Sequence, residues 1–595
     1  MLDKLKTVMG LVRRPWRGWM AASVVGSVII AGLDMLGVAA MLPLMQVVTG
    51  ADRKTGALGF ISSAIGSTEP QMLLIATASV VALAFIVKSA FSIVFRWWLL
   101  GHATALEAEA ATELMRRYVM APYATHRERK LAEVHRNISG AIPQTFSQVV
   151  LGILSLAADA LTLVAIGVVL FAVSPWATLL AVVLFLAMGW GTQAGLKHRY
   201  GVIGETMAQS DLDAWAALMP GINGFRESRL AAAGSVFVSR FARAKADRAR
   251  ASRELSLVSE LPKYVLEIGL VVAIAAVAVL LFATGTPDQA LSVIGVFAAG
   301  STRILPTINR LVATSGVIRA GQVGLRILSD EVQSLDQHRD YEEYPSAVRS
   351  YRGDIELDGV EFSFVDSTEP VLRSVNVTIE EGQTTAFVGS SGAGKSTLLD
   401  VILGLLEPTA GTVRCGGREI RADLAGWYAG LGVVPQDVFL LDDSLESNIA
   451  FAEDPRSIDR ARLNRALSMS QLDELVAGLP EGLSTRLGER GVRMSGGQRQ
   501  RIGIARALYR EPGVLVLDEA TSALDNVTEH RLTETIDALS GSMTIIIVAH
   551  RLSTVRHADK IVYMANGSVE SEGTFDALVE ASPGFSQLVA LGRLV

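Results

Sequence analysis

The sequence predicts an all-α membrane domain of six spanning helices, followed by a soluble α/β domain built around a phosphate-binding loop. Half of the 595 residues are hydrophobic and only 19% are charged, and the mean hydropathy is +0.36. Such a composition places a large part of the chain in lipid. Residues Gly389–Thr397 have the spacing G-x-x-x-x-G-K-[ST] of a phosphate-binding loop. Near residue 350, long apolar stretches give way to short strands alternating with helices.

The chain is too long for one domain. We predict a transmembrane domain at 1–333, a charged linker containing Pro345 at 334–350, and a soluble domain at 351–595. The net charge of -6 is modest and argues against nucleic acid as a partner. The single cysteine, Cys415, excludes a disulfide within the chain. We expect no cleaved signal peptide, because no small-residue cleavage site follows a short apolar core near Met1.

Six apolar stretches approach the roughly 20 residues that cross a hydrocarbon core. They lie at Trp19–Val48, Met72–Leu100, Ser147–Val173, Trp176–Leu196, Val265–Phe282 and Ala290–Val312. Between the first two, an outer segment could form a short amphipathic helix on the membrane surface or a plain loop. Its apolar residues are Leu58, Phe60, Ile61 and Ile65.

Basic residues set the expected orientation. Lysine and arginine gather before the first span and in the connections after spans two and four, whereas the outer loops hold only Arg53 and Lys54. By the positive-inside rule, the N-terminus and the soluble half are cytoplasmic, so we expect a multi-pass protein of the inner (cytoplasmic) membrane. The two inner connections are rich in Ala, Glu and Arg, and we expect them to be helical extensions below the membrane.

The phosphate-binding loop has the flanks that it needs. The apolar run Thr384–Val388 predicts a buried strand before it, and apolar residues at helical spacing follow it. Glycines let backbone N–H groups turn toward phosphate oxygens, and the start of the helix adds its positive dipole end. We expect Lys395 to meet the β- and γ-phosphates and Ser396 to hold Mg²⁺. The predicted phosphate contacts are Gly389, Ser390, Ser391, Gly392, Ala393, Gly394, Lys395, Ser396 and Thr397.

Three further predicted strands end in polar residues suited to phosphate chemistry. The strand Val514–Leu517 ends in Asp518, placed to hold Mg²⁺, and Glu519, placed to polarise a water for in-line attack. Gln436 follows a strand at Val433–Val434 and could bind Mg²⁺ or water. His550 follows the strand Thr544–Ala549, and we expect it to contact the γ-phosphate region.

A second anion site precedes the predicted helix Arg499–Tyr509. Ser495 is a good N-cap, and Gly496, Gly497 and Gln498 leave backbone donors at a positive helix end. One chain cannot obviously use both anion sites on a single phosphate group. We therefore expect this second site to serve the nucleotide of another copy of the chain.

These motifs together resemble the nucleotide-binding domain of an ABC transporter. In the family's order stand the loop 389–397, Gln436, the signature Met494–Gln498, the strand 514–518 with Glu519, the loop Ser522–Asp525, and His550. With six spans before it, the whole chain resembles an ABC exporter half-transporter. The resemblance implies ATP and Mg²⁺ as cofactors, ATP hydrolysis, a homodimer in which each ATP lies between the two copies, and Phe364 stacked on adenine. Met494 replaces the usual leucine and Phe364 the usual tyrosine, and neither change puts hydrolysis in doubt.

The substrate is predicted from the membrane half. The stretches around Lys263 in span five and Arg303–Arg310 in span six resemble bacterial flippases for lipid-linked oligosaccharides. On a helix, Arg303 and Arg310 share one stripe about 10 Å apart along the axis, a spacing suited to a pyrophosphate. Lys263, Arg303 and Arg310 are thus the tentative substrate residues. The alternative is internal pairing with the intramembrane acids Asp34, Asp159 and Glu267.

Two other functions stay open from the sequence alone. A general exporter of lipids, drugs or peptides predicts a mostly apolar, aromatic cavity. An ATP-gated regulator or channel is disfavoured by the intact Glu519 and His550, because gating alone does not need turnover.

Overall fold

The computed structural model describes residues 1–13, 15–40, 43–44, 47, 63, 69–127, 129–284, 287–337, 351–364, 369–519, 526–549 and 555–590, without side-chain detail for 280–303. The chain divides into two compact units. The first comprises Met1–Ala121 and Thr125–Tyr341, and the second comprises Glu342–Val595 with the short stretch Pro122–Ala124.

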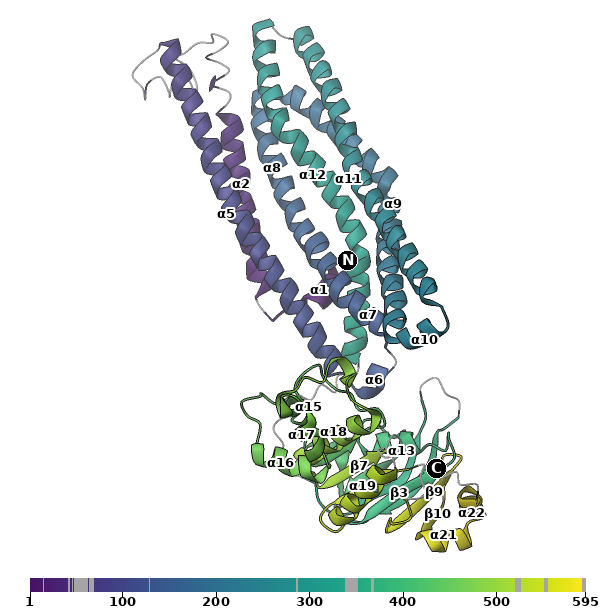
Figure 1. The fold of residues 1–595 in the computed structure, drawn as a ribbon. Helices are drawn as coiled ribbons and strands as arrows, with labels where there is room; N and C mark the ends of the chain where they lie inside the picture. Colours follow the sequence, from purple (N-terminus) through teal and green to yellow (C-terminus); the bar gives the residue numbers. More distant parts are fainter. Residues whose placement is uncertain are drawn as a thin grey trace. The chain divides into compact units, whose positions relative to one another are not determined.

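The first unit is entirely helical in its described part (Figure 1). Several of its helices are far longer than a membrane crossing, since 50 residues of α-helix extend about 75 Å. The long helices α8, α9, α11 and α12 pack on one another, and α2 packs on α5 and α8. The helices are α1 (Leu2–Met9), α2 (Trp16–Ala39), α5 (Pro70–Val119), α6 (Tyr123–Arg127), α7 (Leu131–Arg136), α8 (Leu151–Val173), α9 (Pro175–Asn223), α10 (Phe225–Leu230), α11 (Gly234–Thr284) and α12 (Pro287–Gln337).

The first four predicted spans are confirmed as helices long and apolar enough to cross a membrane. They are Trp16–Ala39, Pro70–Val119, Leu131–Val173 and Thr178–Asn223. The fifth and sixth predicted spans lie inside α11 and α12, whose side chains from 280 to 303 are outside the description. Most of the outer segment with Leu58, Phe60, Ile61 and Ile65, and most of the first span beyond Ala40, also lie outside the described residues.

Local sequence signals explain where the spans begin and turn. Helix α5 has Pro70 in its first turn, where the missing N–H costs nothing. Between α8 and α9, Ser174 is extended (φ -152°) and Pro175 starts the next helix. The predicted antiparallel pair of spans three and four is therefore present, and its turn is as short as predicted.

Two π-helical segments precede α8 and were not predicted. They are η1 (Asn137–Ala141) and η2 (Gln144–Val150). Segment η2 packs closely on α12 because two glycines there lack side chains. A Cβ added to Gly321 would lie 2.8 Å from Cβ of Gln148, and one added to Gly324 would lie 2.7 Å from Oε1 of Gln144. π-Helical turns are rare and are frequent at functional sites.

The predicted start of the linker at residue 334 is wrong. Helix α12 continues to Gln337. Leu335 is 1% exposed, and the Asp336 carboxylate accepts a 2.7 Å hydrogen bond from the buried Arg117 guanidinium of α5. Burial of Leu335 and the ion pair of Asp336 stabilise the helix beyond residue 334, although the composition there resembles that of a linker. Residues 338–350 lie outside the description.

The second unit holds two sheets, of orders β2-β1-β4-β5 and β10-β9-β3-β8-β7-β6. The first is antiparallel, and in the second β9, β3, β8, β7 and β6 run parallel. The strands are β1 (Ile355–Phe362), β2 (Leu372–Ile379), β3 (Thr384–Gly389), β4 (Ala410–Cys415), β5 (Arg418–Glu419), β6 (Leu431–Val434), β7 (Val514–Asp518), β8 (Thr544–Val548), β9 (Lys560–Ala565) and β10 (Ser568–Gly573).

Helices and short 3₁₀ turns connect these strands (Figure 1). The helices are α13 (Lys395–Ile402), α14 (Leu424–Ala429), α15 (Leu445–Ile449), α16 (Arg460–Met469), α17 (Asp473–Gly478), α18 (Gly496–Tyr509), α19 (Asn526–Leu539), α21 (Phe575–Ala581) and α22 (Pro583–Ala590). The 3₁₀ turns are η3 (Ile420–Asp423), η4 (Gly482–Ser484) and η5 (Glu489–Gly491).

The parallel sheet is buried on both faces, which its apolar strands require. Side chains alternate between two cores along each strand. On β8, Ile545 and Ile547 join one core, whereas Ile546 and Val548 join the other. This double burial fixes the strands and hence the positions of the residues that follow their carboxyl ends.

Candidate functional site

The carboxyl edge of the parallel sheet gathers the predicted phosphate residues. Strands β3, β8, β7 and β6 are neighbours in that order. The phosphate-binding loop follows β3, Asp518 ends β7, and Gln436 follows β6 by two residues. Ligands of open α/β sheets bind outside this edge. The predicted strand before His550 is confirmed as β8, but His550 itself lies outside the described residues.

The loop after β3 has the backbone that its glycines allow. Gly392 and Gly394 have φ of +83° and +95°, in the left-handed region that favours glycine. A Cβ on Gly394 would also lie 3.0 Å from the Leu372 side chain. Gly394 is the N-cap of α13, which starts at Lys395 and contains Ser396 and Thr397. The predicted strand–loop–helix arrangement is therefore present.

Lys395 is folded over its own loop. Its Nζ donates to the carbonyl oxygens of Gly389 at 2.8 Å and Ser390 at 3.0 Å, and the residue is 6% exposed. Burial lowers the pKa of its ammonium, while the nearby Glu519 and Asp518 carboxylates oppose this shift. A buried cation held only by neutral carbonyls is suited to bind an anion, which would replace the lost hydration.

Asp518 lies close to two other acidic side chains. Burial raises the pKa of its carboxyl to about 6, and the nearby Glu519 and Asp400 carboxylates add to the rise, while Lys395 opposes it. A carboxylate crowded by other acids gains from a bound cation. This environment fits the predicted magnesium role.

The described residues hold no cluster of three or more acidic, histidine or cysteine side chains that could bind a metal ion by themselves. Magnesium usually keeps several waters and binds through one or two protein groups together with substrate phosphates. Ser396, Gln436 and Asp518, which lie at the ends of neighbouring elements, fit such a partial ligand set.

Gln436 and Glu519 are hydrogen-bonded to each other. The Gln436 Nε2 donates to Glu519 Oε2 at 2.7 Å. Glu519 has φ +51°, a left-handed conformation that is unusual for a residue with a side chain, and its N–H donates to Val548 O at 2.9 Å. This bond across to β8 holds the turn in place. The acid that sequence predicts as the water activator thus sits in a strained, fixed turn beside a predicted magnesium ligand.

The helix at the second predicted anion site begins three residues earlier than expected. Helix α18 starts at Gly496 rather than at Arg499. Ser495 Oγ accepts from Gln498 N at 3.2 Å, and Gln498 Oε1 accepts from Ser495 N at 2.8 Å. This capping box satisfies those two N–H groups internally. The backbone N–H groups of Gly496 and Gly497, with the Ser495 hydroxyl, are the donors suited to an external anion.

Phe364 lies just beyond β1, where its ring is 5.0 Å from that of Phe362 at an interplanar angle of 89°. An edge-to-face contact of this kind fixes the orientation of a ring. Phe364 is only partly buried, so a ring face can accept a planar ligand.

Ion pairs join the charged residues of the membrane helices. The Arg310 guanidinium of α12 donates to Asp159 Oδ1 of α8 from Nη2 at 2.8 Å and from Nε at 3.3 Å. Lys88 of α5 lies 3.0 Å from Asp34 of α2. Internal pairing, the alternative weighed from sequence, is thus what the structure contains at Arg310.

The other two predicted substrate residues are placed differently. Lys263 is about half exposed, 4.0 Å from Glu267 on its own helix, and its ammonium is 5.7 Å from the Tyr264 ring. The side chain of Arg303 lies outside the description. The structure does not bring Lys263 to the Arg310–Asp159 pair by any described contact.

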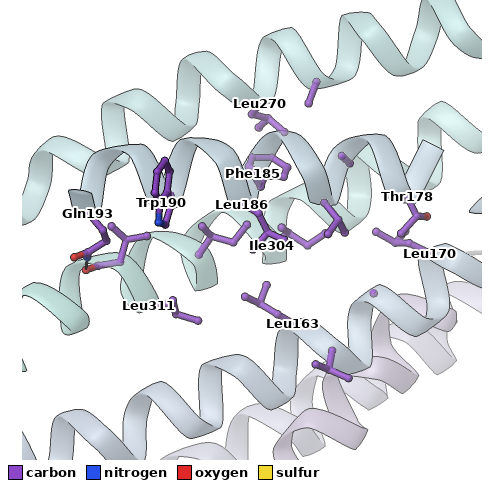
Figure 2. A pocket seen from close by; sticks show the side chains of 18 of the residues that line it. Leu163, Leu170, Thr178, Phe185, Leu186, Trp190, Gln193, Leu270, Ile304 and Leu311 are labelled. Atoms are coloured by element: carbon purple, nitrogen blue, oxygen red, sulfur yellow. Dashed lines mark hydrogen bonds between the residues drawn. The ribbon is translucent and has the colours of Figure 1, made fainter. Parts of the chain in front are cut away.

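An apolar cavity of about 580 Å³ lies between α8, α9, α11 and α12. Figure 2 shows Trp190 and Gln193 toward one end of it, Thr178 and Leu170 toward the other, and Phe185 and Leu186 between them. The lining is largely aliphatic, with Leu163, Leu270, Ile304 and Leu311 from the other three helices. A mostly apolar cavity is what the general-exporter alternative predicted from the sequence, but the residues that line it could not be predicted, since they come from helices distant in the chain.

Comparison with known proteins identifies the family. A family model described as ABC transporter matches residues 372–522. A heterocyst differentiation ATP-binding protein of Nostoc is 32% identical over 69% of this chain and 67% of that protein. An ATP-dependent lipid A-core flippase of Cupriavidus metallidurans is 32% identical over 73% of each chain. The chain belongs to the ABC transporter family.

Two further proteins resemble this chain, one over part of its length and one in its overall fold. A putative multidrug export ATP-binding/permease protein of Staphylococcus aureus is 41% identical over 41% of this chain and 42% of that protein. The structure of a bacterial Atm1-family ABC exporter with ATP bound matches with a TM-score of 0.78 at 23% identity, covering 96% of this chain and 98% of that one. The fold is therefore that of an ABC exporter half-transporter.

The predicted activity class is confirmed with the family. The chain is an ABC exporter, a multi-pass membrane protein that couples ATP hydrolysis to transport, with ATP and Mg²⁺ as its cofactors. The residue roles within this ABC transporter are not fixed by the likeness. They depend on the geometry described above.

Proposed function

We propose that this exporter flips an amphipathic lipid whose head group is a pyrophosphate-linked oligosaccharide and whose anchor is a polyprenyl chain. The cavity between α8, α9, α11 and α12 carries the proposal. Its volume of about 580 Å³ and its aliphatic lining suit a branched hydrocarbon chain, because burial of apolar surface is its main source of affinity. The flippase named for lipid A-core among the relatives supports a lipid substrate.

Arg310 supports the phosphate part of this proposal. Asp159, its partner, is one helical turn before the cavity residue Leu163 on α8, and Arg310 is adjacent to the cavity residue Leu311 on α12. Asp159 binds only the Nε and Nη2 side of the guanidinium among the described residues, and the Arg310 side chain is 59% exposed. The Nη1 side can therefore donate to a phosphate while the carboxylate holds the group in place. We propose that Arg303, seven residues before Arg310 on the same stripe of α12, and Lys263 complete this head-group site.

For the soluble unit, we propose the following roles. Lys395 and the N–H groups of the loop 389–397 bind the β- and γ-phosphates, and Phe364 stacks on the adenine. Ser396, Gln436 and Asp518 hold Mg²⁺, which when bound neutralises phosphate charge. Glu519 orients and polarises the attacking water, and His550 contacts the γ-phosphate. Gln436, hydrogen-bonded to Glu519, aligns that carboxylate.

We propose a homodimer in which Ser495, Gly496 and Gly497 of one copy, positioned by Gln498, bind the ATP held by the loop of the other. The exposed donors at the start of α18 support this arrangement, and light scattering should give twice the 63.4 kDa chain mass. We also propose that the N-terminus and the soluble unit face the cytoplasm, as the positive-inside rule predicts.

A second candidate is a general exporter of lipids, drugs or peptides, and the same apolar lining favours it. The two candidates differ in what Arg310 does. A general exporter needs no cation at the head-group position, so Arg310 would serve only to neutralise Asp159.

The experiment that separates them compares Arg310→Ala, Asp159→Asn and the double variant in lipid vesicles. If Arg310 binds the head group, Arg310→Ala should lower flipping of a polyprenyl-pyrophosphate oligosaccharide about tenfold or more, since a hydrogen bond between charged groups contributes about 1.5–3 kcal/mol. Arg310→Lys should restore only part, because an ammonium cannot make the bidentate contact. Basal ATPase activity should stay near wild type.

A purely structural pair gives another pattern. Arg310→Ala then leaves the buried Asp159 carboxylate unpaired, and Asp159→Asn leaves the Arg310 guanidinium unpaired within the membrane helices. Each single change lowers the thermal unfolding temperature, and the double variant recovers it. Arg326→Ala is the matched control, since Arg326 lies on the same helix in an exposed pair with Glu205. Normal flipping by a stable Arg310→Ala variant would contradict the head-group role and favour the general exporter.

A further inference from the structure

Arg96 stands apart from the other basic residues of the predicted spans. Lys88 and Arg310 are paired with acids at 3.0 and 2.8 Å. Arg96, in the apolar part of α5, has neither an ion pair nor a hydrogen bond within the described part of the chain. A charged group at the centre of a membrane span costs about 3 kcal/mol even on lenient scales, and an arginine nearer the end of a span extends toward polar groups at the membrane interface. An arginine without a protein partner there is suited to a bound anion.

The Arg96 side chain lines a second cavity, of about 270 Å³, distinct from the apolar one. The other lining residues are Leu99 and Leu100 of α5 and residues of η2, α8 and α12, which include Ser147, Gln148, Ser155 and Thr314. No acidic residue lines it. At about 30 Å³ per water molecule, the cavity has room for a phosphate group and several waters.

Each uncharged polar side chain in this cavity can donate a hydrogen bond. The side chains of Gln148, Ser155 and Thr314 make no hydrogen bond within the described residues, whereas Ser147 donates to Pro143 O. The Arg96 guanidinium adds five N–H groups. Donors from four segments therefore line one cavity, and no carboxylate among the described residues competes for them. Such a set of donors is suited to bind the oxygen atoms of an anion.

The π-helical segment η2 shapes one wall of the cavity. Ser147 and Gln148 lie on η2, whose wider turns place side chains differently from an α-helix. Its close contact with α12 at Gly321 fixes this wall relative to Thr314. The site is thus built from rigid helices rather than from a loop, which favours selective binding.

The neighbours of Arg96 indicate that the anion belongs to a lipid. Trp97 is 78% exposed and Trp98 stacks on Phe95 at 5.8 Å, immediately beside Arg96. Tryptophans are enriched at the level of lipid head groups. We propose that Arg96, Gln148, Ser155 and Thr314 form a binding site for the phosphate of a membrane lipid. This site lies outside the apolar cavity assigned to transport, and its Ser155 and Thr314 are one helical turn from Asp159 and Arg310. This inference does not rest on the proposed substrate.

The test measures lipid binding by the purified full-length protein with native mass spectrometry. The probes are phosphatidic acid, which carries a phosphate, and diacylglycerol, which lacks it. Arg96→Ala should weaken phosphatidic acid binding about 10- to 100-fold, the effect of losing a charge-assisted bidentate contact. Thr314→Val, which keeps the side-chain shape, should weaken it less. Diacylglycerol should bind far more weakly than phosphatidic acid to the wild type.

Arg253→Ala is the matched control, because Arg253 is exposed and makes no ion pair or hydrogen bond among the described residues. It should leave phosphatidic acid binding unchanged. Arg96→Lys should retain part of the binding, which keeps the test decisive if Arg96→Ala does not fold. Equal binding of the two lipids by the wild type, or unchanged binding by folded Arg96 variants, would overturn the site. Displacement of phosphatidic acid by inorganic phosphate would overturn the lipid assignment and leave a free-phosphate site.

Discussion

Glu519→Gln should abolish steady-state ATP hydrolysis while ATP stays bound. The amide keeps the size of the side chain and can still meet Gln436, but it cannot polarise a water molecule. Turnover should fall about 10³-fold or more, the general scale for losing a catalytic group. Asp518, Ser396 and Lys395 remain, so nucleotide affinity should be preserved. Retained radiolabelled ATP after rapid gel filtration, measured beside the steady-state rate, checks this expectation.

The control is Gln436→Ala, which removes the 2.7 Å hydrogen bond to Glu519 but leaves the carboxylate. A positioning role for Gln436 predicts a smaller loss of turnover than Glu519→Gln produces, because the water activator is still present. If Glu519→Gln turned over ATP at a rate near wild type, another residue would have to activate the water, and the proposed role of Glu519 would be wrong.

Lys395→Ala should weaken ATP binding about 100-fold or more. The ammonium can contact two phosphate groups, and a hydrogen bond between charged partners contributes about 1.5–3 kcal/mol. The nucleotide-free fold should change little in stability. In the described structure the buried Nζ binds only the Gly389 and Ser390 carbonyls, and removal of a buried charge offsets their loss. Titration with a fluorescent ATP analogue and thermal unfolding without nucleotide measure the two effects.

Lys395→Arg provides the matched control for charge. A guanidinium is larger and needs a planar arrangement of acceptors, so it should not restore binding in a loop that already encloses lysine at 6% exposure. Near-normal ATP affinity in Lys395→Ala would show that the loop N–H groups alone bind the phosphates.

Local patterns were sufficient to predict much of the fold. Strands β3, β7 and β8 lie where apolar runs predicted them, because a strand buried on both faces must be apolar throughout. The glycines at 392 and 394 predicted a tight phosphate-binding loop, and both residues have the positive φ that glycine tolerates. Spans one to four were predicted for the same local reason: a membrane crossing needs an uninterrupted apolar stretch.

Contacts between residues that are far apart in the sequence could not be predicted. Three intramembrane acids were possible partners of Arg310, and the packing of α12 on α8 determines that Asp159 is the partner. The bond between Gln436 and Glu519 joins residues 83 positions apart and depends on β6 lying next to β7. Segments η1 and η2 carry no distinctive composition, and the glycines of α12 that pack closely on them lie more than 170 residues further along the chain. The end of α12 at Gln337 depends on Arg117, more than 200 residues away.

The two ion pairs of the membrane helices set an order on assembly during synthesis. Asp34 meets Lys88 one span later, so this carboxylate is paired as soon as the second span has been inserted. Asp159 has its partner Arg310 a further 151 residues along the chain. An unpaired carboxylate in lipid costs about 3 kcal/mol, and the third span carries that cost until the sixth span, which contains Arg310, has been synthesised. The partly inserted domain therefore carries the cost of the unpaired Asp159 carboxylate. That cost ends when α12 is inserted and Arg310 pairs with Asp159.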